Sequence, residues 1–576
     1  MPAGSFMPWQ YMLPINSGAS HKYYITIVNL TPYRFVKTSQ NSYQFDVFDF
    51  GDIPSGKARQ NTMTYTNRVG ANPVDDNGEA YYQLQGTGKT FTIRGTTHIP
   101  GSYPMRTVVD LTGMGLGQRE YGDPAPEASV TLVITGSEQY GYITSLDFGQ
   151  QNNWMRQLYD VIKDRQLRHV VVPGSHDAGM GTISQAWIGL GSSPNTQTQG
   201  LNTYDQLRAG SRWFDMRLVS VNGGDFWAAH VNDETSNTPV GATGEAVNDI
   251  IAGINRFTQG SPGEVIILWV RYLVNLDSSI DGRTRYWSAA KANEFYTKLE
   301  SINNRCTSGL DKTTKFDRLA AQKFLDQNGG KGCVLIMTDG RLQAGVPTER
   351  PASGIFHGPD WMDRDDFWAD KGDTASLAAA QVAHMTGTRR DGGGGDSFLI
   401  TQWQCTPDVV TATLYGLSSI AILPTNPSLY WAAVNSMSPE AWPTVILQDY
   451  LGLIHTGESA FPGQLGAEAR VLAMGLNLYM ASQNCDVSSR RNPLLKNRVA
   501  AASVVASTAS AAKAFVAPAA DAPFTGVIYA NGTVDRAPAP GFHLGRPAVL
   551  KNGTVLGNGT VLSGDRQNPH FSSKLY

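Results

Sequence analysis

The sequence predicts an α/β protein in which a TIM-type (β/α)8 barrel is preceded by an N-terminal all-β sandwich. Residues 1–145 show strand-like alternation and no helical period, which is typical of a β-sandwich. Residues 146–482 alternate short apolar strands with helical segments, which is typical of βα units. No GxGxxG turn occurs in that stretch, so a closed barrel is favoured over a doubly wound parallel sheet, which is the alternative.

Length and composition narrow the class of protein. A chain of 576 residues exceeds what one hydrophobic core supports, so at least two domains are expected. With 41% hydrophobic and 16% charged residues, the chain is typical of soluble globular proteins. Its net charge of −3 argues against a nucleic-acid partner, which would require a basic surface. No uninterrupted apolar run of about eighteen residues occurs, so no membrane-spanning helix is predicted.

Cysteines and glycosylation motifs favour a secreted, extracellular protein. The first residues form neither a charged nor an apolar signal region, so we expect a signal peptide to be absent or already removed. No CxxC pair occurs, so a zinc site is not predicted, and two disulfides with three connectivities stay open. The cysteines are Cys306, Cys333, Cys405 and Cys485. Asn-X-Thr motifs begin at Asn29, Asn531, Asn552 and Asn558.

The N-terminal 145 residues show strand signals separated by turn residues. Tyr23–Leu30 is an apolar strand, and alternate residues are apolar around Phe91 and Ile93 and again from Val130 to Ile134. Clusters of Gly, Pro, Asn and Asp lie between them. No charged constellation accompanies these strands, so a structural role is expected. Binding of lipid or polymer through aromatic loops is the alternative.

Seven strands are predicted between residues 146 and 482. They are His169–Val172, Ser211–Leu218, Phe226–Ala229, Glu264–Val270, Cys333–Met337, Phe398–Trp403 and Pro443–Leu447. Apolar residues between 246 and 257 recur at i, i+3, i+4 and i+7, which predicts an amphipathic helix ended by Gly260 and Pro262. Residues 483–576 are predicted to be a low-complexity linker and C-terminal tail, because Ala, Ser, Thr and Pro dominate from about residue 499.

Chemically active side chains follow these strands. His176 and Asp177 come shortly after the β-branched run Val170–Val172, in the sequence VVVPGSHDAG. Other candidates at or near strand ends are Asp215, Arg217, His230, Arg271 and Asp449. The first two of these lie two residues apart on one strand and therefore share a face. Because a closed barrel brings its strand ends to one mouth, we expect all of these residues to meet there.

Two imidazoles, a guanidinium and several carboxylates predict phosphodiester cleavage. One imidazole can remove a proton from the attacking hydroxyl, the other can protonate the leaving alkoxide, and carboxylates fix the tautomers of both rings. A guanidinium is a planar, permanently charged fork that matches two phosphate oxygens. This chemistry requires neither a metal nor another cofactor.

These motifs resemble the X-box of phosphatidylinositol-specific phospholipase C, in its small metal-independent bacterial type. The resemblance rests on VVPGSHDAG, QLRAGSRWFDMRL, the strand before His230 and VILQDY, with NWM before the first strand, and covers about residues 150–455. Secreted fungal proteins with a β-domain before the barrel have a similar plan. The resemblance implies a lyase that converts phosphatidylinositol, or its glycan-linked form, to inositol 1,2-cyclic phosphate and diacylglycerol at a membrane surface.

The resemblance also implies a role for each candidate. His176 resembles the general base that takes the proton of the inositol 2-hydroxyl, oriented by Asp449. His230 resembles the general acid that protonates the leaving diacylglycerol oxygen, assisted by Asp177. Arg217 resembles the phosphate clamp. The implied substrate contacts are Asp215, Arg271 and Asp370.

Three departures from the family pattern bear on metal use and on the head group. The calcium-dependent members carry an acidic residue where this chain has Trp213, and Arg217 supplies a cation nearby, so calcium dependence is disfavoured. Val231 replaces the glycine that usually follows the general acid. TDGR, with Asp339 and Arg341, stands where the bacterial members carry an inositol-facing basic residue, so the head group is less determined than the chemistry.

A membrane contact is expected at the mouth of the barrel. Trp187 and Ile188, in SQAWIGLGSSP, are the predicted interfacial residues, because tryptophan suits the boundary between lipid and water. The alternative is that they cap the barrel's own core.

Two other functions stay open. The first is a glycerophosphodiesterase-like or phospholipase D-like enzyme, which would need a metal held by an acidic trio that Trp213 interrupts. The second is a non-catalytic lipid- or glycan-binding protein, against which the intact set of catalytic residues argues.

Overall fold

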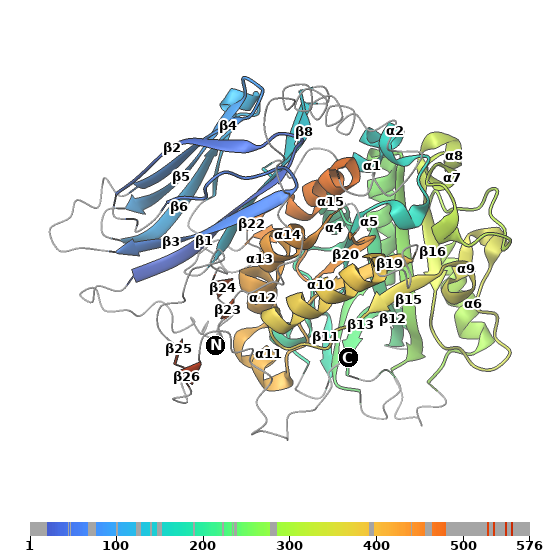
Figure 1. The fold of residues 1–576 in the computed structure, drawn as a ribbon. Helices are drawn as coiled ribbons and strands as arrows, with labels where there is room; N and C mark the ends of the chain where they lie inside the picture. Colours follow the sequence, from blue (N-terminus) through green and yellow to red (C-terminus); the bar gives the residue numbers. More distant parts are fainter. Residues whose placement is uncertain are drawn as a thin grey trace.

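The computed structural model places an N-terminal all-β part beside a larger α/β part (Figure 1). It describes residues 20–479 and four two-residue strands of the tail, β23 (Val527–Ile528), β24 (Val534–Asp535), β25 (Ala548–Val549) and β26 (Val555–Leu556). The gaps in 20–479 are 44, 46–47, 67–76, 100–101, 122–127, 139–140, 147–151, 188–190, 222–223, 233, 235–238, 277–284, 391–396, 439–440 and 455–463.

Two sheets form the N-terminal part. One has the order β3–β1–β8–β9 and the other the order β2–β4–β5–β6–β7. Their strands are β1 (Ser20–Leu30), β2 (Phe35–Tyr43), β3 (Lys57–Thr66), β4 (Asn77–Leu84), β5 (Thr90–Ile99), β6 (Ser102–Asp110), β7 (Gln118–Tyr121), β8 (Ser129–Ser137) and β9 (Gly141–Thr144). Both sheets contribute to one buried apolar cluster, with Ile25 and Leu132 from the first and Phe35 and Ile93 from the second. The predicted strand Tyr23–Leu30 lies within β1.

Eight parallel strands curl into the sheet that carries the candidate site. Their order is β17–β16–β15–β12–β10–β20–β19–β18. The strands are β10 (Val172–Ser175), β12 (Trp213–Val221), β15 (Glu264–Asn275), β16 (Gly332–Thr338), β17 (Ile355–His357), β18 (Arg364–Phe367), β19 (Phe398–Trp403) and β20 (Val445–Gln448). The structure therefore confirms a curled parallel sheet of the α/β class.

The closure of that sheet differs from the prediction. In the described part of the chain no ladder joins β17 to β18, so the curled sheet is open between them. These two strands have only three and four residues, and α9 (Gly358–Trp361) lies between them in the chain.

An antiparallel extension grows from β12, which is itself a strand of the parallel sheet. The second half of β12 pairs with β13 (Asp225–Val231), which continues to β14 (Gly241–Ala246) and β11 (Gln185–Trp187). The predicted strand Phe226–Ala229 exists within β13, but it is not one of the parallel strands. His230 therefore lies within an antiparallel strand and not at the exit of a barrel strand.

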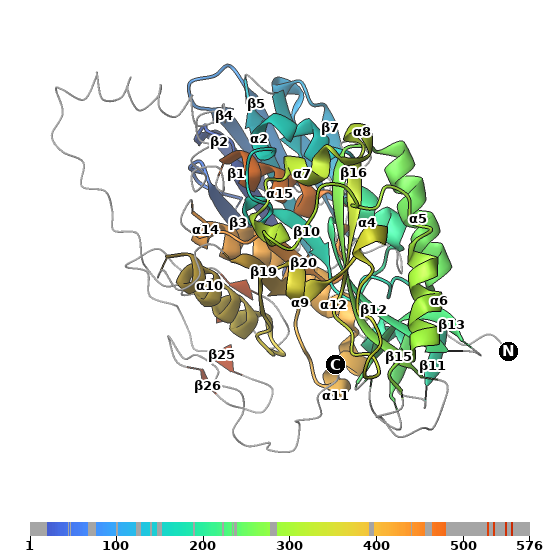
Figure 2. The same cartoon turned by 90° about the vertical axis from the view of Figure 1, so that its right-hand side faces the viewer.

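Helices cover the outside of the curled sheet (Figure 2). They are α1 (Trp154–Gln157), α2 (Tyr159–Ile162), α3 (Ser193–Thr196), α4 (Thr203–Ala209), α5 (Val247–Gly260), α6 (Ala289–Leu299), α7 (Gln322–Leu325), α8 (Gln327–Gly330), α9, α10 (Thr374–Arg390), α11 (Val409–Tyr415), α12 (Leu417–Ile420), α13 (Asn426–Ser428), α14 (Val434–Ser436) and α15 (Glu468–Tyr479). The predicted amphipathic helix is α5, which buries Ile250, Ile254 and Phe257 on one face. Two short strands, β21 (Leu453–Ile454) and β22 (Gln464–Leu465), precede α15.

The two parts pack into one body along α15. Val28 and Val133 of the four-stranded sheet share a buried cluster with Leu472 of α15. Gly475 approaches so closely that a Cβ there would lie 2.5 Å from the side chain of Leu30, so this position requires glycine. The guanidinium of Arg119 also donates a hydrogen bond of 2.9 Å to the carbonyl of Leu465.

One disulfide, between Cys306 and Cys333, forms among the described cysteines. Cys405 is buried with a free thiol, and Cys485 lies outside the described residues. Within those residues no single helix has the length and apolar composition to cross a membrane. The helical segments Val409–Tyr415 and Leu417–Ser436 have that length and composition only when taken together, and they are bent by 87° relative to each other.

A buried ion pair closes the end of the sheet opposite the site. Arg212 and Glu264 are both fully buried, and Nη2 of Arg212 lies 2.6 Å from Oε2 of Glu264. Burial raises the pKa of Glu264, although Arg212 opposes that shift. We expect Arg212→Met to lower the free energy of unfolding by about 3–5 kcal/mol, because the carboxylate is left buried without a partner. Urea unfolding measures this loss.

The double variant Arg212→Met/Glu264→Leu is the control for that prediction. Because it removes both charges together, it should recover most of the lost stability. If the free energy of unfolding of the single variant lies within about 1 kcal/mol of the parent's, the ion pair is not essential for stability.

Candidate active site

The strand register brings three predicted site residues together. β10 lies between β12 and β20, and its last residue, Ser175, pairs with Phe214 on one side and Gln448 on the other. The residues that follow these three are His176, Asp215 and Asp449. Equivalent positions on neighbouring parallel strands present their side chains to the same face, so the predicted convergence is observed here.

His176 is held by a carboxylate on one ring nitrogen and a guanidinium on the other. Its Nδ1 lies 2.7 Å from Oδ1 of Asp449, and its Nε2 lies 2.9 Å from Nη2 of Arg217. A carboxylate accepts and a guanidinium donates, so both contacts are satisfied by the neutral tautomer that carries its proton on Nδ1. Burial alone would lower the pKa of His176, but the Asp177 and Asp449 carboxylates outweigh it and raise that pKa.

Arg217 lies at the centre of the site, between its carboxylates. Its Nε pairs with Oδ1 of Asp177, and its Nη2 lies 3.3 Å from Oδ2 of Asp215. Asp177 has a φ of 41°, in the left-handed region that aspartate tolerates better than most residues. Burial works against the charge of Arg217, but Asp177 and neighbouring groups raise its pKa well above the ordinary value. The guanidinium is therefore a permanent cation at the centre of the mouth.

His230 reaches the same place from β13. Its Nδ1 lies 3.0 Å from the carbonyl oxygen of Thr196, so this nitrogen must carry a proton. The same nitrogen is 3.7 Å from Oδ2 of Asp177. Burial lowers the pKa of His230, and the nearby charge of Arg217 lowers it further, against the opposing effect of Asp177. The two imidazoles are thus linked through Asp177 and Arg217.

A charge ladder of alternating acidic and basic groups extends from Arg217 across the mouth. Its members in spatial order are Arg217, Asp215, Arg271, Asp366, Arg364 and Asp339. Nε of Arg271 lies 3.2 Å from Asp215, and its Nη2 lies 2.7 Å from Asp366. Burial would raise the pKa of Asp215, but Arg271 and Arg217 hold it well below its ordinary value.

Two ladder members, Asp366 and Arg364, were missed by the sequence reasoning. Arg364 pairs with Asp366, reaches Oδ2 of Asp339 at 2.8 Å, and stacks over Trp269 with 4.2 Å between guanidinium carbon and ring centre. Both lie on β18, whose sequence RDDF has no apolar run to mark it as a strand. The sequence did offer one signal: Arg364 and Asp366 are two residues apart, a spacing that puts both side chains on one face of a strand.

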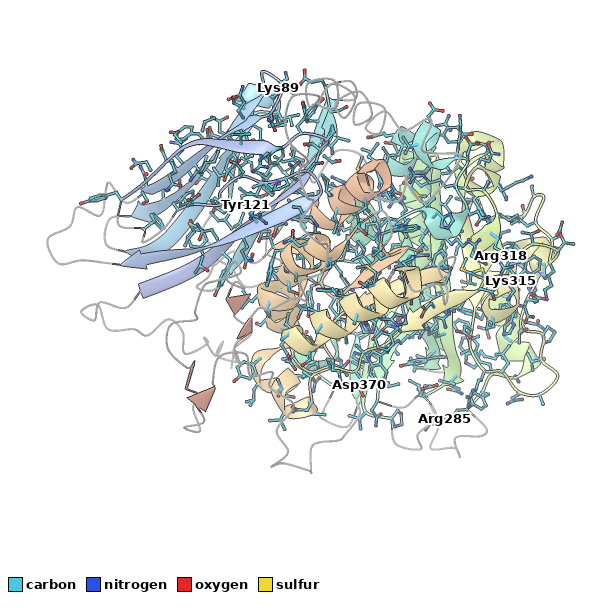
Figure 3. All side chains as sticks on the ribbon, viewed as in Figure 1. Lys89, Tyr121, Arg285, Lys315, Arg318 and Asp370 are labelled. Atoms are coloured by element: carbon cyan, nitrogen blue, oxygen red, sulfur yellow. A yellow bond between two sulfur atoms is a disulfide. The ribbon has the colours of Figure 1, made fainter. Side chains whose placement is uncertain are left out.

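Asp370, the predicted acidic contact, lies beyond the end of β18 with an exposed side chain. Figure 3 shows it along the same lower edge as Arg285, whose backbone bonds to Asn275 at the end of β15. Asp366 is therefore the acidic residue of this strand that meets Arg271. Trp187 is the last residue of β11, while its side chain and Ile188 lie outside what the structure describes.

Three side chains of the site form a group that could hold a metal ion by distance alone. One ligand atom each from His176, Asp177 and Asp215 lie within 4.8 Å of one another. Arg217 contacts every member of this group. A metal ion at this position would therefore have to displace a guanidinium that already balances the carboxylate charge.

Comparison with known proteins identifies relatives for part of the chain. A PI-PLC X domain-containing protein of Dictyostelium discoideum is 30% identical over 108 residues, which cover 16% of this chain and 19% of that protein. A PI-PLC X-box domain-containing protein of the same organism is 26% identical over 144 residues, 23% of this chain and 18% of that protein. Part of this chain is therefore similar in sequence to two PI-PLC X-domain proteins. It spans less than one fifth of the length of either relative.

Solved structures similar to this chain include two bacterial enzymes. A phosphatidylinositol-specific phospholipase C of Staphylococcus aureus aligns over 56% of this chain and 97% of its own, with a TM-score of 0.38 and 15% identity. That of Listeria monocytogenes aligns over 57% and 98%, with a TM-score of 0.33 and 13% identity. No protein-family profile matches the chain.

Proposed function

We propose that the chain is a phospholipase C-type phosphodiesterase that cleaves phosphatidylinositol, or its glycan-linked form, to inositol 1,2-cyclic phosphate and diacylglycerol. The observation that carries the proposal is two imidazoles linked to one guanidinium. His176 Nε2 lies 2.9 Å from Arg217, and His230 Nδ1 lies 3.7 Å from Asp177, which itself pairs with Arg217. The X-domain relatives supply the substrate class.

The reaction would proceed by one proton transfer at each imidazole. His176, neutral at Nε2, takes the proton of the inositol 2-hydroxyl as its oxygen attacks phosphorus. Asp449 stabilises the imidazolium that results, through Nδ1–H. His230, when protonated at both ring nitrogens, gives its Nε2 proton to the diacylglycerol oxygen as the phosphorus–oxygen bond breaks, and Asp177 favours that cationic form. Arg217 stabilises the charge that builds up on the phosphate oxygens.

The charge ladder supports recognition of a polyol head group. Vicinal hydroxyls both donate and accept hydrogen bonds, and the ladder offers alternating carboxylate acceptors and guanidinium donors. Arg271 and Arg364 both form ion pairs, yet they are the most exposed basic residues of the ladder. Their side chains keep 29% and 20% of their surface accessible. We therefore assign head-group contact to Arg271, Arg364 and Asp366 in addition to Asp215.

Release of cyclic inositol phosphate from phosphatidylinositol vesicles tests the proposed function. Purified full-length chain should form the cyclic product and diacylglycerol in the presence of EDTA, and added calcium should not raise the rate. Activity that appears only with a divalent cation would favour the metal-dependent glycerophosphodiesterase-like alternative, for which His176, Asp177 and Asp215 would be the ligands. Binding without turnover would favour a non-catalytic lipid- or glycan-binding protein.

Secretion is part of the proposal. The Cys306–Cys333 disulfide supports it, because disulfides persist in oxidising compartments. The predicted boundaries at residues 145 and 482 also remain proposals, with the N-terminal sheets assigned a structural role against α15.

A membrane-facing patch on α11 supports a lipid substrate. The patch consists of Val410, Leu414 and Tyr415, whose side chains are 52%, 73% and 67% exposed. Thr413 of the same helix accepts a hydrogen bond of 3.4 Å from Asn195 on α3, the helix whose last residue, Thr196, holds His230. The patch therefore belongs to the rim of the mouth, where α11 lies at the lower edge of Figure 1.

We expect Leu414→Ser/Tyr415→Ser to weaken vesicle binding and turnover on vesicles by about tenfold or more, because each removes apolar contact worth about 1.5 kcal/mol or more. Hydrolysis of a soluble inositol phosphodiester should stay close to that of the parent. Vesicle sedimentation and the two turnover assays measure the difference. Trp187→Ala in the same assays tests the predicted contact of β11 with lipid.

Tyr43→Ser is the matched control, since Tyr43 is 45% exposed on the N-terminal five-stranded sheet, away from the mouth. Equal losses in the control and the α11 variant, or equal losses on vesicles and soluble substrate, would rule out docking through α11.

A further inference from the structure

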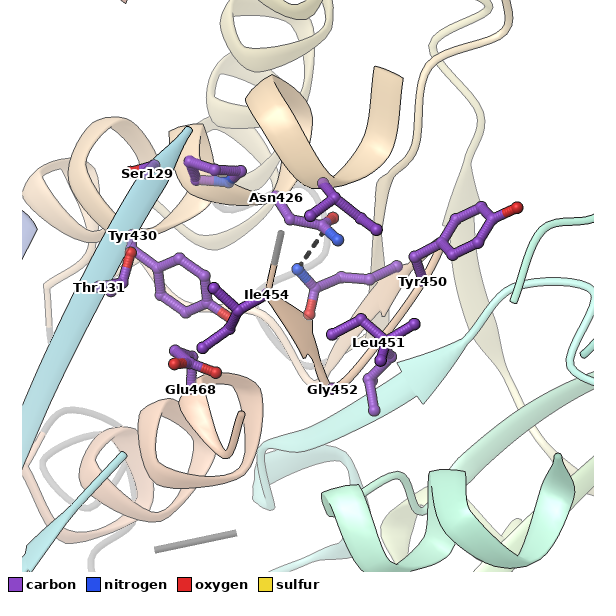
Figure 4. Close-up of a pocket in the computed structure, with 13 residues that line it drawn as sticks. Ser129, Thr131, Asn426, Tyr430, Tyr450, Leu451, Gly452, Ile454 and Glu468 are labelled. Carbon is purple, nitrogen blue, oxygen red and sulfur yellow. Dashed lines mark hydrogen bonds between the residues drawn. The ribbon is translucent and has the colours of Figure 1, made fainter. Parts of the chain in front are cut away.

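A small pocket lies where the four-stranded N-terminal sheet meets the curled sheet. It is lined by Ser129 and Thr131 of β8, by Gln448 and Tyr450 on either side of Asp449, and by Glu468 at the start of α15 (Figure 4). Its volume is about 30 Å³, which is room for one or two guests of the size of water. The pocket adjoins the active site along the chain, since Gln448 and Tyr450, which line it, flank Asp449.

Three oxygen atoms from three elements converge on this pocket without a partner. They are Oγ of Ser129, Oε1 of Gln448 and Oε1 of Glu468, all buried and without a hydrogen bond among the described residues. Gln448 and Glu468 are 1% and 6% exposed. Burying such atoms without a partner is unfavourable, so this arrangement indicates a guest that is not protein.

The orientation of the Gln448 amide is fixed from outside the pocket. Its nitrogen donates a hydrogen bond of 3.2 Å to Oδ1 of Asn426, drawn as the dashed line in Figure 4. The amide nitrogen is therefore taken up by Asn426, which leaves the amide oxygen to the pocket that Gln448 lines. The pocket presents acceptor oxygens, which suits a cation better than an anion.

The charge in the pocket is that of Glu468. Burial raises the pKa of this carboxyl to about 7, against the opposing effect of Arg119 and Arg470, so the group is ionised above that pH. Glu468 forms no ion pair with any residue that the structure describes. Arg119, the nearest basic group of the N-terminal sheets, directs its guanidinium to the carbonyls of Leu146 and Leu465 instead. A water molecule would satisfy hydrogen bonds but not the charge.

We propose that this pocket binds a monovalent metal cation, sodium or potassium, through Glu468, Gln448 and Ser129. Calcium is less suited, because it takes six to eight oxygen ligands and is usually held by more than one carboxylate. The bound cation would join β8 of the N-terminal sheet to α15 and to the turn after β20. It would also reach the active site, because Asn426, which holds Gln448, donates a bond of 2.8 Å to the carbonyl of Asp449.

Thermal unfolding of the full chain tests the site without any measurement of activity. At pH 8 and constant ionic strength, the melting temperature should rise by about 1–3 °C when choline chloride is replaced by sodium or potassium chloride. The rise should saturate with cation concentration. Glu468→Gln should remove this dependence, whereas Glu138→Gln, which changes an exposed carboxylate just beyond β8, should retain it.

Ser129→Ala provides a second variant should Glu468→Gln fail to fold, and it should shift saturation to higher cation concentration. A crystal soaked in rubidium or thallium(I) should show an anomalous peak between Glu468 and Gln448. The same melting temperature in choline, sodium and potassium, or an undiminished cation effect in the folded Glu468→Gln variant, would overturn the proposal. So would stabilisation that appears only on acidification, since a proton rather than a metal would then neutralise Glu468.

Discussion

His176→Ala and His230→Ala are each expected to reduce the rate of cyclic inositol phosphate release by about 10²–10⁴-fold. In its neutral tautomer, His176 has an unprotonated Nε2 that lies 2.9 Å from Nη2 of Arg217. His230 is fixed by the Thr196 carbonyl at 3.0 Å from Nδ1, so the protonated ring can deliver a proton from Nε2. Single-turnover assays on vesicles measure both rates, and circular dichroism checks that both variants are folded.

Near-parental turnover in either folded histidine variant would contradict the assignment of acid and base. Asp449→Asn is a milder variant that tests the same role of His176. The Asp449 carboxylate helps to raise the pKa of His176, and the base works only in its neutral form. Loss of that charge should therefore move the acidic limb of the pH–rate profile to lower pH, while the maximal rate falls. An acidic limb that stays in place would assign it to another group.

The residues around His176 could be predicted because each follows an apolar strand. In His176, Asp215 and Asp449, a polar side chain comes directly after buried residues of neighbouring parallel strands, and register then sets them together. The sequence did not show that the strand before His230 is antiparallel. Alternation of apolar and polar residues is the same in both kinds of strand, so the direction depends on the pairing partners, which here are β12 and β14, the adjacent strands in the chain.

The other side of the mouth was harder to predict, because β18 consists mostly of charged residues. Arg364 and Asp366 occupy alternate positions of a strand that pairs with β19, and they face the mouth through ion pairs rather than apolar packing. Strand prediction depends on apolar or β-branched residues, which RDDF lacks except for its last residue. The opening between β17 and β18 arises in the same region, where strands of three and four residues do not complete the ring.

Arg217 contacts three of the candidate catalytic residues at once. Its Nη2 lies 2.9 Å from His176 and 3.3 Å from Asp215, while its Nε pairs with Asp177. The same three residues are the ones whose ligand atoms could otherwise hold a metal. A guanidinium reaches all three because its donors form a planar fork, and it keeps its charge at every working pH.

Arg217→Lys is therefore expected to lower the rate of cyclic product release by about 10²–10³-fold, although the charge is conserved. A lysine ammonium can approach one or two of these groups, but it cannot also present two parallel donors to the phosphate. Arg208→Lys is the matched control, because Arg208 pairs with Asp205 on α4 at the surface and should tolerate the change. The parent should keep its rate in EDTA, since Arg217 supplies the positive charge that a metal would otherwise provide. A parent enzyme that EDTA inactivates and calcium restores would show that the cation at this site is a metal, and the role of Arg217 would then have to be reassigned.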